Sequence, residues 1–220
     1  LKDQRKHHVK VQRQKWFGCA CCPPNVIRLL ASLEDYIYSV SGRDVYIHLY
    51  VGGSLEADAE GRAVRLDVNT NYPWEGSVAI AVQEDAEFAL KLRVPGWCKK
   101  WHVKANGEAA EIEPENGYLS LDRAWKKGDR IELEMDMPVA LVRANPRVFE
   151  DVGKIAVTRG PVVYCLEEAD NTRNLHLVRL GETNATDFDA TWKPEKLGGI
   201  VELKSPGIRE TDAGWGETLY

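Results

Sequence analysis

Apolar and polar side chains alternate with a period of two along most of the chain between residues 63 and 135. Such alternation is typical of strands with one buried face. Short turn signals separate the alternating runs, among them Asn106-Gly107, a pair that favours a two-residue hairpin turn. Many short strands joined by tight turns indicate an antiparallel sandwich or barrel. The predicted strands cover residues 63–69, 77–82, 88–94, 101–105, 118–121 and 130–135.

A helical period precedes these strands. Four apolar residues follow one another at the i, i+3, i+4, i+7 spacing of an amphipathic helix, namely Val26, Leu29, Leu30 and Leu33. We expect this helix to begin at Asn25 and to end near Asp35. Residues 36–40 and 45–50 are rich in strand formers and flank turn residues, so a hairpin should follow the helix.

Beyond residue 138 the strand signals become shorter and more scattered. They cover residues 138–146, 154–159, 161–166, 175–180 and 200–203, and the polar stretch 181–199 reads as a long loop. We therefore predict one β-sandwich over residues 36–145 and a second one, truncated, over residues 146–220. About four strands are few for a closed sandwich, which is why the second is expected to be incomplete.

Composition and charge exclude several classes of partner. The 220 residues are 44% hydrophobic and 29% charged, with a formal net charge of −5. This balance argues against nucleic acid or an anionic membrane as the main partner. The longest apolar runs fall short of the roughly 20 residues of a membrane span, and residues 1–15 contain no signal-peptide pattern. Because the chain starts at Leu1 within a polar stretch, we expect it to be part of a longer protein.

The most reactive stretch of the sequence is a cluster of thiols. Cys19, Cys21 and Cys22 fall within four residues, and the chain has five cysteines in all. An odd, clustered set does not fit a disulfide framework and favours a reducing compartment, so we expect a cytoplasmic protein. Two prolines and then Asn25 follow, which predicts a stiff loop at a helix N-terminus. The positive end of the helix dipole stabilises a thiolate there.

The spacing of these cysteines leaves four interpretations open. A structural zinc site would repeat a C-x2-C pair, and no second cluster follows. A redox couple would use C-x-x-C spacing, which only Cys19 and Cys22 meet. The other two are three buried thiols, and a catalytic or metal-bound thiolate completed from outside the chain. Cys98 and Cys165 stand alone in predicted β regions, where a buried small residue is the expected role.

Carboxylates do not choose among these interpretations. A classical glycosidase needs two of them, about 5–10 Å apart, and the 34 acidic residues form no recognisable pair. Glu34-Asp35 end the predicted helix, far along the chain from the cysteines, and a helix-surface pair is the simpler explanation. A non-catalytic β-sandwich that binds carbohydrate or serves as a scaffold is therefore a second function class that the residues allow.

The cysteine loop and the helix after it resemble the end of the catalytic domain in the β-L-arabinofuranosidases of glycoside hydrolase family 127. The resemblance lies in the run WFGCACCPPNVIRLLASLEDYIYSV at residues 16–40. Three later stretches are also similar to that family: VPGWC, KKGDRIEL and KIAVTRGPVVYCLE, at residues 94–98, 126–133 and 154–167.

The resemblance implies a mainly β chain, with antiparallel β-sandwich domains preceded by the last loop and helix of an (α/α)6-barrel catalytic domain. Residues 1–35 would form the C-terminal edge of that barrel. The implied reaction is release of non-reducing-end β-L-arabinofuranose with retention of configuration. The partner would then be an oligosaccharide or glycoconjugate that contains L-arabinofuranose. No nucleic acid or membrane partner is expected, and a homodimer is one candidate assembly.

The same resemblance implies a zinc cofactor held by one glutamate and three cysteines. By position, Cys21 matches the nucleophile, which is also a zinc ligand, and Cys22 matches a second cysteine ligand. Cys19 matches a further cysteine near the site. The two remaining ligands and the general acid lie upstream in the family, outside this chain. Several hundred helical residues before Leu1 in the open reading frame would favour the enzyme, whereas a gene that starts near Leu1 would favour the binding module.

Overall fold

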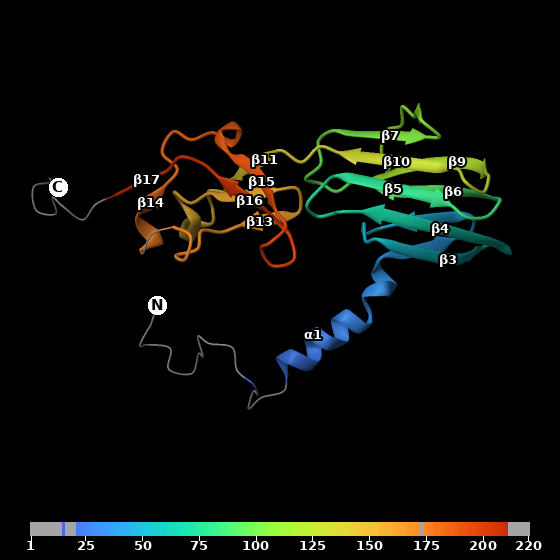
Figure 1. Cartoon of the computed structure of the whole chain (residues 1–220), viewed down its shortest axis with the longest axis horizontal. Helices are drawn as coiled ribbons and strands as arrows, with labels where there is room; N and C mark the ends of the chain where they lie inside the picture. The colour runs from blue at the N-terminus through green and yellow to red at the C-terminus, as the bar shows by residue number, and fades with distance from the viewer. Residues whose placement is uncertain (1–14, 16–20, 172–173, 211–220) are drawn as a thin grey trace, which may run out of the picture.

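The computed structural model of the chain describes residues 15, 21–171 and 174–210. Strands dominate it, as the alternating pattern predicts. Figure 1 shows a β-sandwich on the right, a second group of strands on the left, and the helix α1 projecting below the sandwich. The sandwich holds nearly all of the buried apolar side chains of the described residues.

The helix α1 spans Cys22–Ala31 and is followed by a 3-10 helix over Leu33–Tyr36. The prediction that the helix begins at Asn25 is wrong by three residues. Proline lacks an N–H group, and the first N–H groups of a helix have no partner within it, so both prolines fit into the first turn. Cys21 is the N-cap residue and makes no side-chain capping hydrogen bond.

A four-stranded sheet, here called sheet A, forms one half of the sandwich. Its strand order is β1-β2-β6-β9, and the β2–β6 pair is parallel whereas the other two pairs are antiparallel. The hairpin predicted after the helix is confirmed as β1 and β2, which turn through Gly42 at a positive φ of 59°. The strands of sheet A are β1 (Tyr38–Ser41), β2 (Asp44–Ile47), β6 (Ala86–Arg93) and β9 (Tyr118–Trp125).

A six-stranded antiparallel sheet, sheet B, forms the other half. Its order is β3-β4-β5-β10-β7-β8. All six strands predicted between residues 63 and 135 are present in the two sheets. Its strands are β3 (Gly53–Ala59), β4 (Arg62–Thr70), β5 (Ser77–Val82), β7 (Trp101–Ala105), β8 (Glu108–Ala109) and β10 (Arg130–Met135).

Strand β3 was not predicted, because its inward positions are weak signals. Leu55 is the only large apolar residue in it, and Ala57 and Ala59 complete the inward row. Alanine has a low strand propensity, and an initial glycine lowers it further. The pairing of β3 with β4, over seven residue pairs from Gly53 to Ala59, supplies what the local sequence lacks.

The core lies between the two sheets. Inward side chains from sheet A and from sheet B belong to one apolar cluster, and the largest fully buried members include Trp125, Phe88, Leu66, Ile80, Leu90, Leu92, Leu119, Ile131 and Leu133. The Trp125 indole N–H donates to the Phe88 carbonyl oxygen over 3.1 Å, so the largest core residue leaves no buried donor unpaired. Along most strands, outward-facing residues alternate with these buried residues.

The described residues after Pro138 form three small sheets instead of a closed sandwich. Val201 is the one buried apolar side chain among them. The pairing of β11 with β12 makes β11 part of the first of these sheets, so the strands change sheet after β10, before the boundary predicted at residue 145. The three sheets are β11-β12-β13 (Val139–Val142, Ala156–Arg159, Val162–Tyr164), β14-β17 (Val178–Arg179, Ile208–Arg209) and β15-β16 (Asp189–Lys193, Ile200–Lys204).

Short 3-10 helices connect these strands, at Phe149–Asp151, Leu175–Leu177 and Ala185–Asp187. The stretch predicted as a loop, residues 181–199, contains β15. All but one of the side chains of β15 are exposed, so it lacks the apolar alternation by which a strand is found in a sequence.

One polar contact and one aromatic contact join the sandwich to the strands that follow. The Arg159 guanidinium donates to the carbonyl oxygen of Trp74 over 2.7 Å, and the Trp74 and Trp192 rings lie 6.4 Å apart between centroids. Arg159 is on β12, Trp74 follows β4, and Trp192 is on β15. Segments that are far apart in the sequence therefore meet at this junction.

The outward face of sheet A carries a hydrogen-bonded group of side chains, here called the tyrosine–histidine cluster and made of Ser39, Tyr46, His48 and Tyr118. The His48 Nε2 atom lies 2.7 Å from the Ser39 hydroxyl, and its Nδ1 atom lies 2.7 Å from the Tyr118 hydroxyl. The Tyr46 ring stacks on the imidazole with centroids 5.8 Å apart. Partial burial and then the nearby Arg93 charge hold the pKa of His48 below its ordinary value.

Gly76→Ala should destabilise the sandwich, because a Cβ atom at residue 76 would overlap the Met135 carbonyl oxygen in the neighbouring strand. Backbone atoms cannot move aside as a flexible side chain can, so we expect a loss of about 2 kcal/mol or more in the free energy of unfolding. Gly96→Ala is the matched control, since a Cβ atom there meets nothing within 4 Å. Urea denaturation measures both, and equal stability of the two variants would contradict the packing described.

The free energy of unfolding should decrease as the pH falls from about 7 through the lowered pKa of His48. In that window the unfolded chain, with an ordinary histidine pKa of about 6.5, binds more protons than the folded chain does. His48→Gln keeps hydrogen-bonding groups but does not titrate, so its stability should decrease less between pH 7.5 and pH 5. His102→Gln, at an exposed position of β7, is the control and should follow the wild type. Urea midpoints at the two pH values measure this, and the same decrease in His48→Gln as in the wild type would refute it.

Candidate functional site

Two of the three clustered cysteines are at the N-terminus of α1. Cys21 is the N-cap residue and Cys22 is the first helical residue, and both are exposed. Their Sγ atoms lie 3.6 Å apart. Cys19 falls outside the described residues. The structure therefore places the predicted nucleophile Cys21 and the predicted ligand Cys22 side by side, at the positive end of the helix dipole.

Asn25 fixes the backbone around these thiols. Its side-chain amide donates to the carbonyl oxygen of Cys21 over 2.8 Å, and its Oδ1 atom accepts from the Arg28 guanidinium over 3.3 Å. Asn25 is therefore not the N-cap that the sequence suggested; it is a residue of the first turn that ties this turn to the residue before it. The thiol pair is therefore held by the first turn of α1.

The donor set and its spacing fit a soft divalent ion such as zinc. Two sulfur atoms bound to one tetrahedral zinc at about 2.3 Å each would lie about 3.8 Å apart, close to the 3.6 Å observed between Cys21 and Cys22. Within residues 15, 21–171 and 174–210, no three His, Cys, Asp or Glu side chains gather as a metal site. Two thiols can supply only half of a tetrahedral zinc shell, so further ligands would have to come from elsewhere.

The acidic pair Glu34-Asp35 lies at the opposite end of the helix from the thiols. The ten residues of α1 separate them, a length of about 15 Å. Glu34 and Asp35 line an open groove of about 550 Å³ between the 3-10 helix and β3, together with Glu56. A carboxylate that works with Cys21 on one sugar would have to lie within about 5–10 Å. These two acids are therefore not the partners of Cys21.

The two lone cysteines occupy different environments. Cys98 is buried, its thiol donates to the Lys100 carbonyl oxygen over 3.1 Å, and burial raises its pKa. The prediction of a buried structural thiol is confirmed for Cys98. It is wrong for Cys165, whose thiol is exposed just beyond β13. The burial expected from the alternating pattern fails there because no position of β12 or β13 is buried among the described residues.

The apolar side of α1 is uncovered among the described residues. Val26, Ile27, Leu29 and Leu30 are 57%, 65%, 58% and 64% exposed, and no residue of the helix is buried. In Figure 1 the C-terminal end of α1 lies near the sandwich, and the N-terminal end points away from both sheets. An amphipathic helix gains stability mainly from packing of its apolar face. The helix that presents the thiols thus has an apolar face that is unpacked in the described part of the chain.

The tyrosine–histidine cluster is a feature that no predicted site residue pointed to. The signal available in the sequence is that Tyr46 lies between the buried Val45 and Ile47, and that His48 takes the next outward position. Several aromatic rings on one outward face form an apolar patch, which is a more informative signal than a single exposed ring.

None of the described helices is long and apolar enough to cross a membrane.

Two family models match the chain over most of the described strands. Residues 44–137 match the middle domain of the glycoside hydrolase family 127 β-L-arabinofuranosidases, and residues 139–198 match the C-terminal domain of the same family. The junction between the two matches falls where the strands change from the sandwich to the smaller sheets. The two models agree with the change of sheet at residue 138.

Known proteins of this family are similar along nearly the whole chain. A non-reducing-end β-L-arabinofuranosidase of Bifidobacterium longum subsp. longum is 38% identical over 96% of the chain. A crystal structure of a GH127 β-L-arabinofuranosidase from Geobacillus stearothermophilus T6 covers 100% of the chain with 41% identity and a TM-score of 0.88. A second GH127 β-arabinofuranosidase structure covers 91% with 38% identity and a TM-score of 0.85.

The chain spans only part of these relatives, namely 33% of the Bifidobacterium protein and 35% of the Geobacillus chain. The antiparallel sheets that the resemblance implies are present, and the described residues contain no helical barrel. Both family models, the curated relative and the structural neighbours point to one assignment. The chain belongs to glycoside hydrolase family 127.

Proposed function

We propose that the protein containing this chain is a retaining glycosidase that releases β-L-arabinofuranose from non-reducing ends, and that Cys21 is its nucleophile. The observation that carries this proposal is the pair of exposed thiols, 3.6 Å apart at the N-terminus of α1, in a chain of this family. The named activities of the relatives support the substrate class. The chain spans about a third of the length of those relatives, so the activity is proposed for the whole protein and not for this chain alone.

The chemistry assigned to Cys21 is attack on the anomeric carbon. The thiolate sulfur forms a bond to that carbon while the bond to the leaving-group oxygen breaks, and an acid outside this chain gives that oxygen a proton. Water then gives a proton to that same group outside this chain and forms a bond to the anomeric carbon from the opposite side, while the carbon–sulfur bond breaks and the thiolate is restored. Two inversions at one carbon give net retention of configuration.

Zinc fits the residues present, and Cys21 and Cys22 would hold it. When bound, zinc keeps thiols deprotonated and fixes their positions. The resemblance assigns one further glutamate and one further cysteine ligand to residues outside this chain. Cys19 is proposed as a third cysteine near the site.

The residues of α1 place the nucleophile. Asn25 holds the carbonyl group of Cys21, and this restricts the backbone from which the thiol projects. Cys21 is also at the N-terminus of α1, which is the positive end of the helix dipole. The nucleophile is therefore oriented by a regular element and not by a free loop, which suits a group that must attack from one direction.

The partner proposed for the site is an oligosaccharide or glycoconjugate that ends in L-arabinofuranose. A cytoplasmic location remains a prediction that rests on the clustered thiols. Assembly as a homodimer likewise remains a prediction. The carbohydrate partner is the part of this set that the relatives support.

Cys21→Ser in the full-length enzyme should abolish nearly all turnover, with a loss of about 10³-fold or more in kcat. A serine hydroxyl is a poor zinc ligand and stays protonated at neutral pH. Cys165→Ser is the control, because that thiol is exposed on a different part of the chain. Release of L-arabinose from a synthetic β-L-arabinofuranoside measures both variants. A Cys21→Ser enzyme with kcat near that of the wild type would show that the nucleophile is another residue.

Residues 1–220 alone should release no L-arabinose and should retain little zinc, whereas the full-length protein should hold about one zinc per chain. Two neighbouring thiolates without further fixed ligands cannot complete the metal shell. Affinity should also fall at lower pH, because protons compete for the thiolates. Metal analysis of both proteins after exhaustive dialysis under reducing conditions tests this. One tightly held zinc in residues 1–220 would instead identify a self-sufficient structural site.

A further inference from the structure

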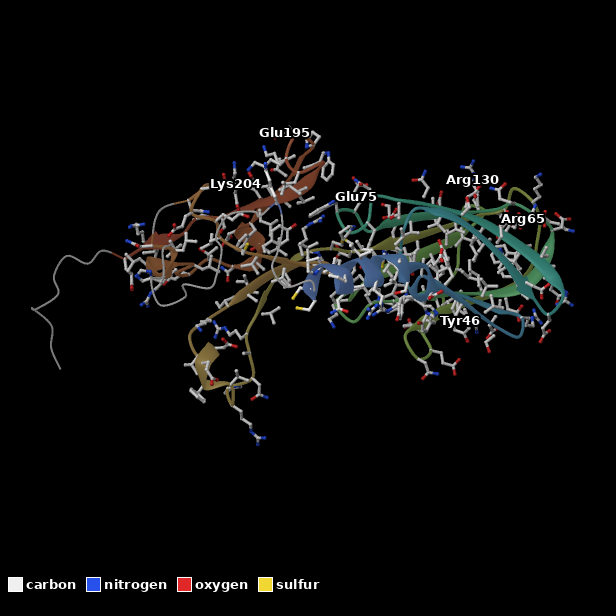
Figure 2. All side chains as sticks on the ribbon, turned by 90° about the horizontal axis from the view of Figure 1, so that it is seen from below. Tyr46, Arg65, Glu75, Arg130, Glu195 and Lys204 are labelled. Atoms are coloured by element: carbon white, nitrogen blue, oxygen red, sulfur yellow. The ribbon has the colours of Figure 1, made fainter. Side chains whose placement is uncertain are left out.

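The outward face of sheet A differs in chemistry from that of sheet B. The exposed strand positions of sheet B carry no tyrosine, tryptophan or phenylalanine, and charged residues prevail there, such as Glu56, Arg65, Asp67, Glu132 and Glu134. Sheet A presents the rings of Tyr46, His48 and Tyr118 at its outward positions. Figure 2 shows Tyr46 on the side of the sandwich opposite to Arg65 and Arg130.

Tyr46 is on β2, His48 directly follows β2, and Tyr118 is on β9. The side chains of β6 between them complete a continuous platform. Tyr46 of β2 is in register with Lys91 of β6, which is in register with Ser120 of β9. In the next row Arg93 of β6 is in register with Tyr118 of β9. The Tyr46 and Tyr118 rings meet edge to face with centroids 5.3 Å apart. The platform is therefore built from side chains on rigid strands.

The hydrogen bonds of the cluster fix these rings in place. The imidazole of His48 lies between the hydroxyl groups of Ser39 and Tyr118, at 2.7 Å from each. The Tyr46 hydroxyl donates to the Asp44 carboxylate over 3.3 Å. These rings are ordered before a ligand binds to this face, and this lowers the entropic cost of binding.

The charges around the rings balance one another. Lys91 lies 3.6 Å from Asp44 and donates to Ser120 over 2.8 Å, and Arg43 pairs with Asp122 and lies 3.5 Å from Glu87. With Arg93 this makes three cations and three anions, so the face has no net charge to attract a polyanion. The Lys91 and Asp44 side chains are 21% and 31% exposed, and they remain within reach of a ligand at the surface.

We propose that the outward face of sheet A binds a neutral carbohydrate chain. The rings of Tyr46 and Tyr118, which meet edge to face, offer apolar ring surface to the C–H groups of the sugars. Asp44, Lys91 and Ser120 exchange hydrogen bonds with the sugar hydroxyl groups. The choice of L-arabinofuranose as the sugar rests on the proposed function. The platform itself rests on the geometry of the sheet.

The same chemistry disfavours the other classes of partner. Nucleic acid needs an excess of positive charge, which the three cations and three anions do not give. The core of a protein interface is depleted of charged residues, whereas Lys91 and Asp44 lie beside the Tyr46 ring. A neutral ligand rich in hydroxyl groups, with apolar patches between them, matches rings flanked by paired charges.

Binding can be measured without turnover, on the 220-residue chain with its tyrosine rings labelled with carbon-13. An L-arabinofuranose trisaccharide should shift the Tyr46 and Tyr118 ring signals in a saturable way and leave those of Tyr36 unchanged. Tyr46→Ala should weaken binding about tenfold or more, because it removes one of the two tyrosine rings. Tyr118→Phe keeps the ring and should bind within about threefold of the wild type. Tyr36→Ala removes an exposed tyrosine of the 3-10 helix and should bind as the wild type does.

Several results would overturn the proposal. Absence of saturable shifts in the wild-type chain would do so even if Tyr46→Ala failed to fold. Saturable shifts confined to other tyrosines, or unchanged affinity in a folded Tyr46→Ala variant, would place the site elsewhere. Self-association of the chain that Tyr46→Ala abolishes would identify the face as a protein interface. Equal affinity for cellotriose would overturn the sugar assignment alone. Because no step of the assay uses Cys21, its result is separate from the turnover test of the proposed function.

Discussion

The burial of two sheets against each other is the constraint on which the rest of the described structure depends. Inward residues of sheet A and of sheet B belong to one apolar cluster, with Trp125 and Phe88 among its largest members. Once these rows face inward, every second residue of each strand must face outward. The outward rows can then differ freely, and they do: sheet B is charged, and sheet A carries the tyrosine–histidine cluster. Surface chemistry is thus decided separately from the fold.

The sandwich could be predicted from the sequence because its strands carry their own signal. Strands β4, β5 and β10 alternate large apolar and polar residues, and turn residues separate them. Strands β3 and β15 could not be found this way. The first has alanines where a large apolar residue would be expected, and most side chains of the second are exposed. Both are formed by pairing with a neighbouring strand, which is a tertiary effect that no local pattern records.

The clustered cysteines can be found in the sequence, whereas their surroundings cannot. Three cysteines within four residues form a cluster that packing alone does not require, and the structure places two of them at a helix N-terminus. Periodicity also located the helix, yet it placed the start at Asn25 because an asparagine before an apolar stripe is a common N-cap. The two prolines fit inside the first turn instead. The polar face of sheet A could not be predicted, because its rows are set by the register of three strands from distant parts of the chain.

The exposed helix α1 carries the thiols at its N-terminal end, so a change in the tilt of the helix moves them. Its base is the short 3-10 helix over Leu33–Tyr36 and its length is about 15 Å. A tilt of about 10° at the base would displace the sulfur atoms by about 3 Å, several times the roughly 0.5 Å within which catalytic groups must be held. The sandwich therefore fixes the position of the C-terminal end of α1, but it cannot by itself fix the position of the sulfur atoms at the other end. That position must be decided by whatever structure packs against the apolar stripe of Val26, Leu29 and Leu30. If Cys21 is the nucleophile proposed above, substitutions in that packing can change the rate as strongly as substitutions beside the sulfur atoms.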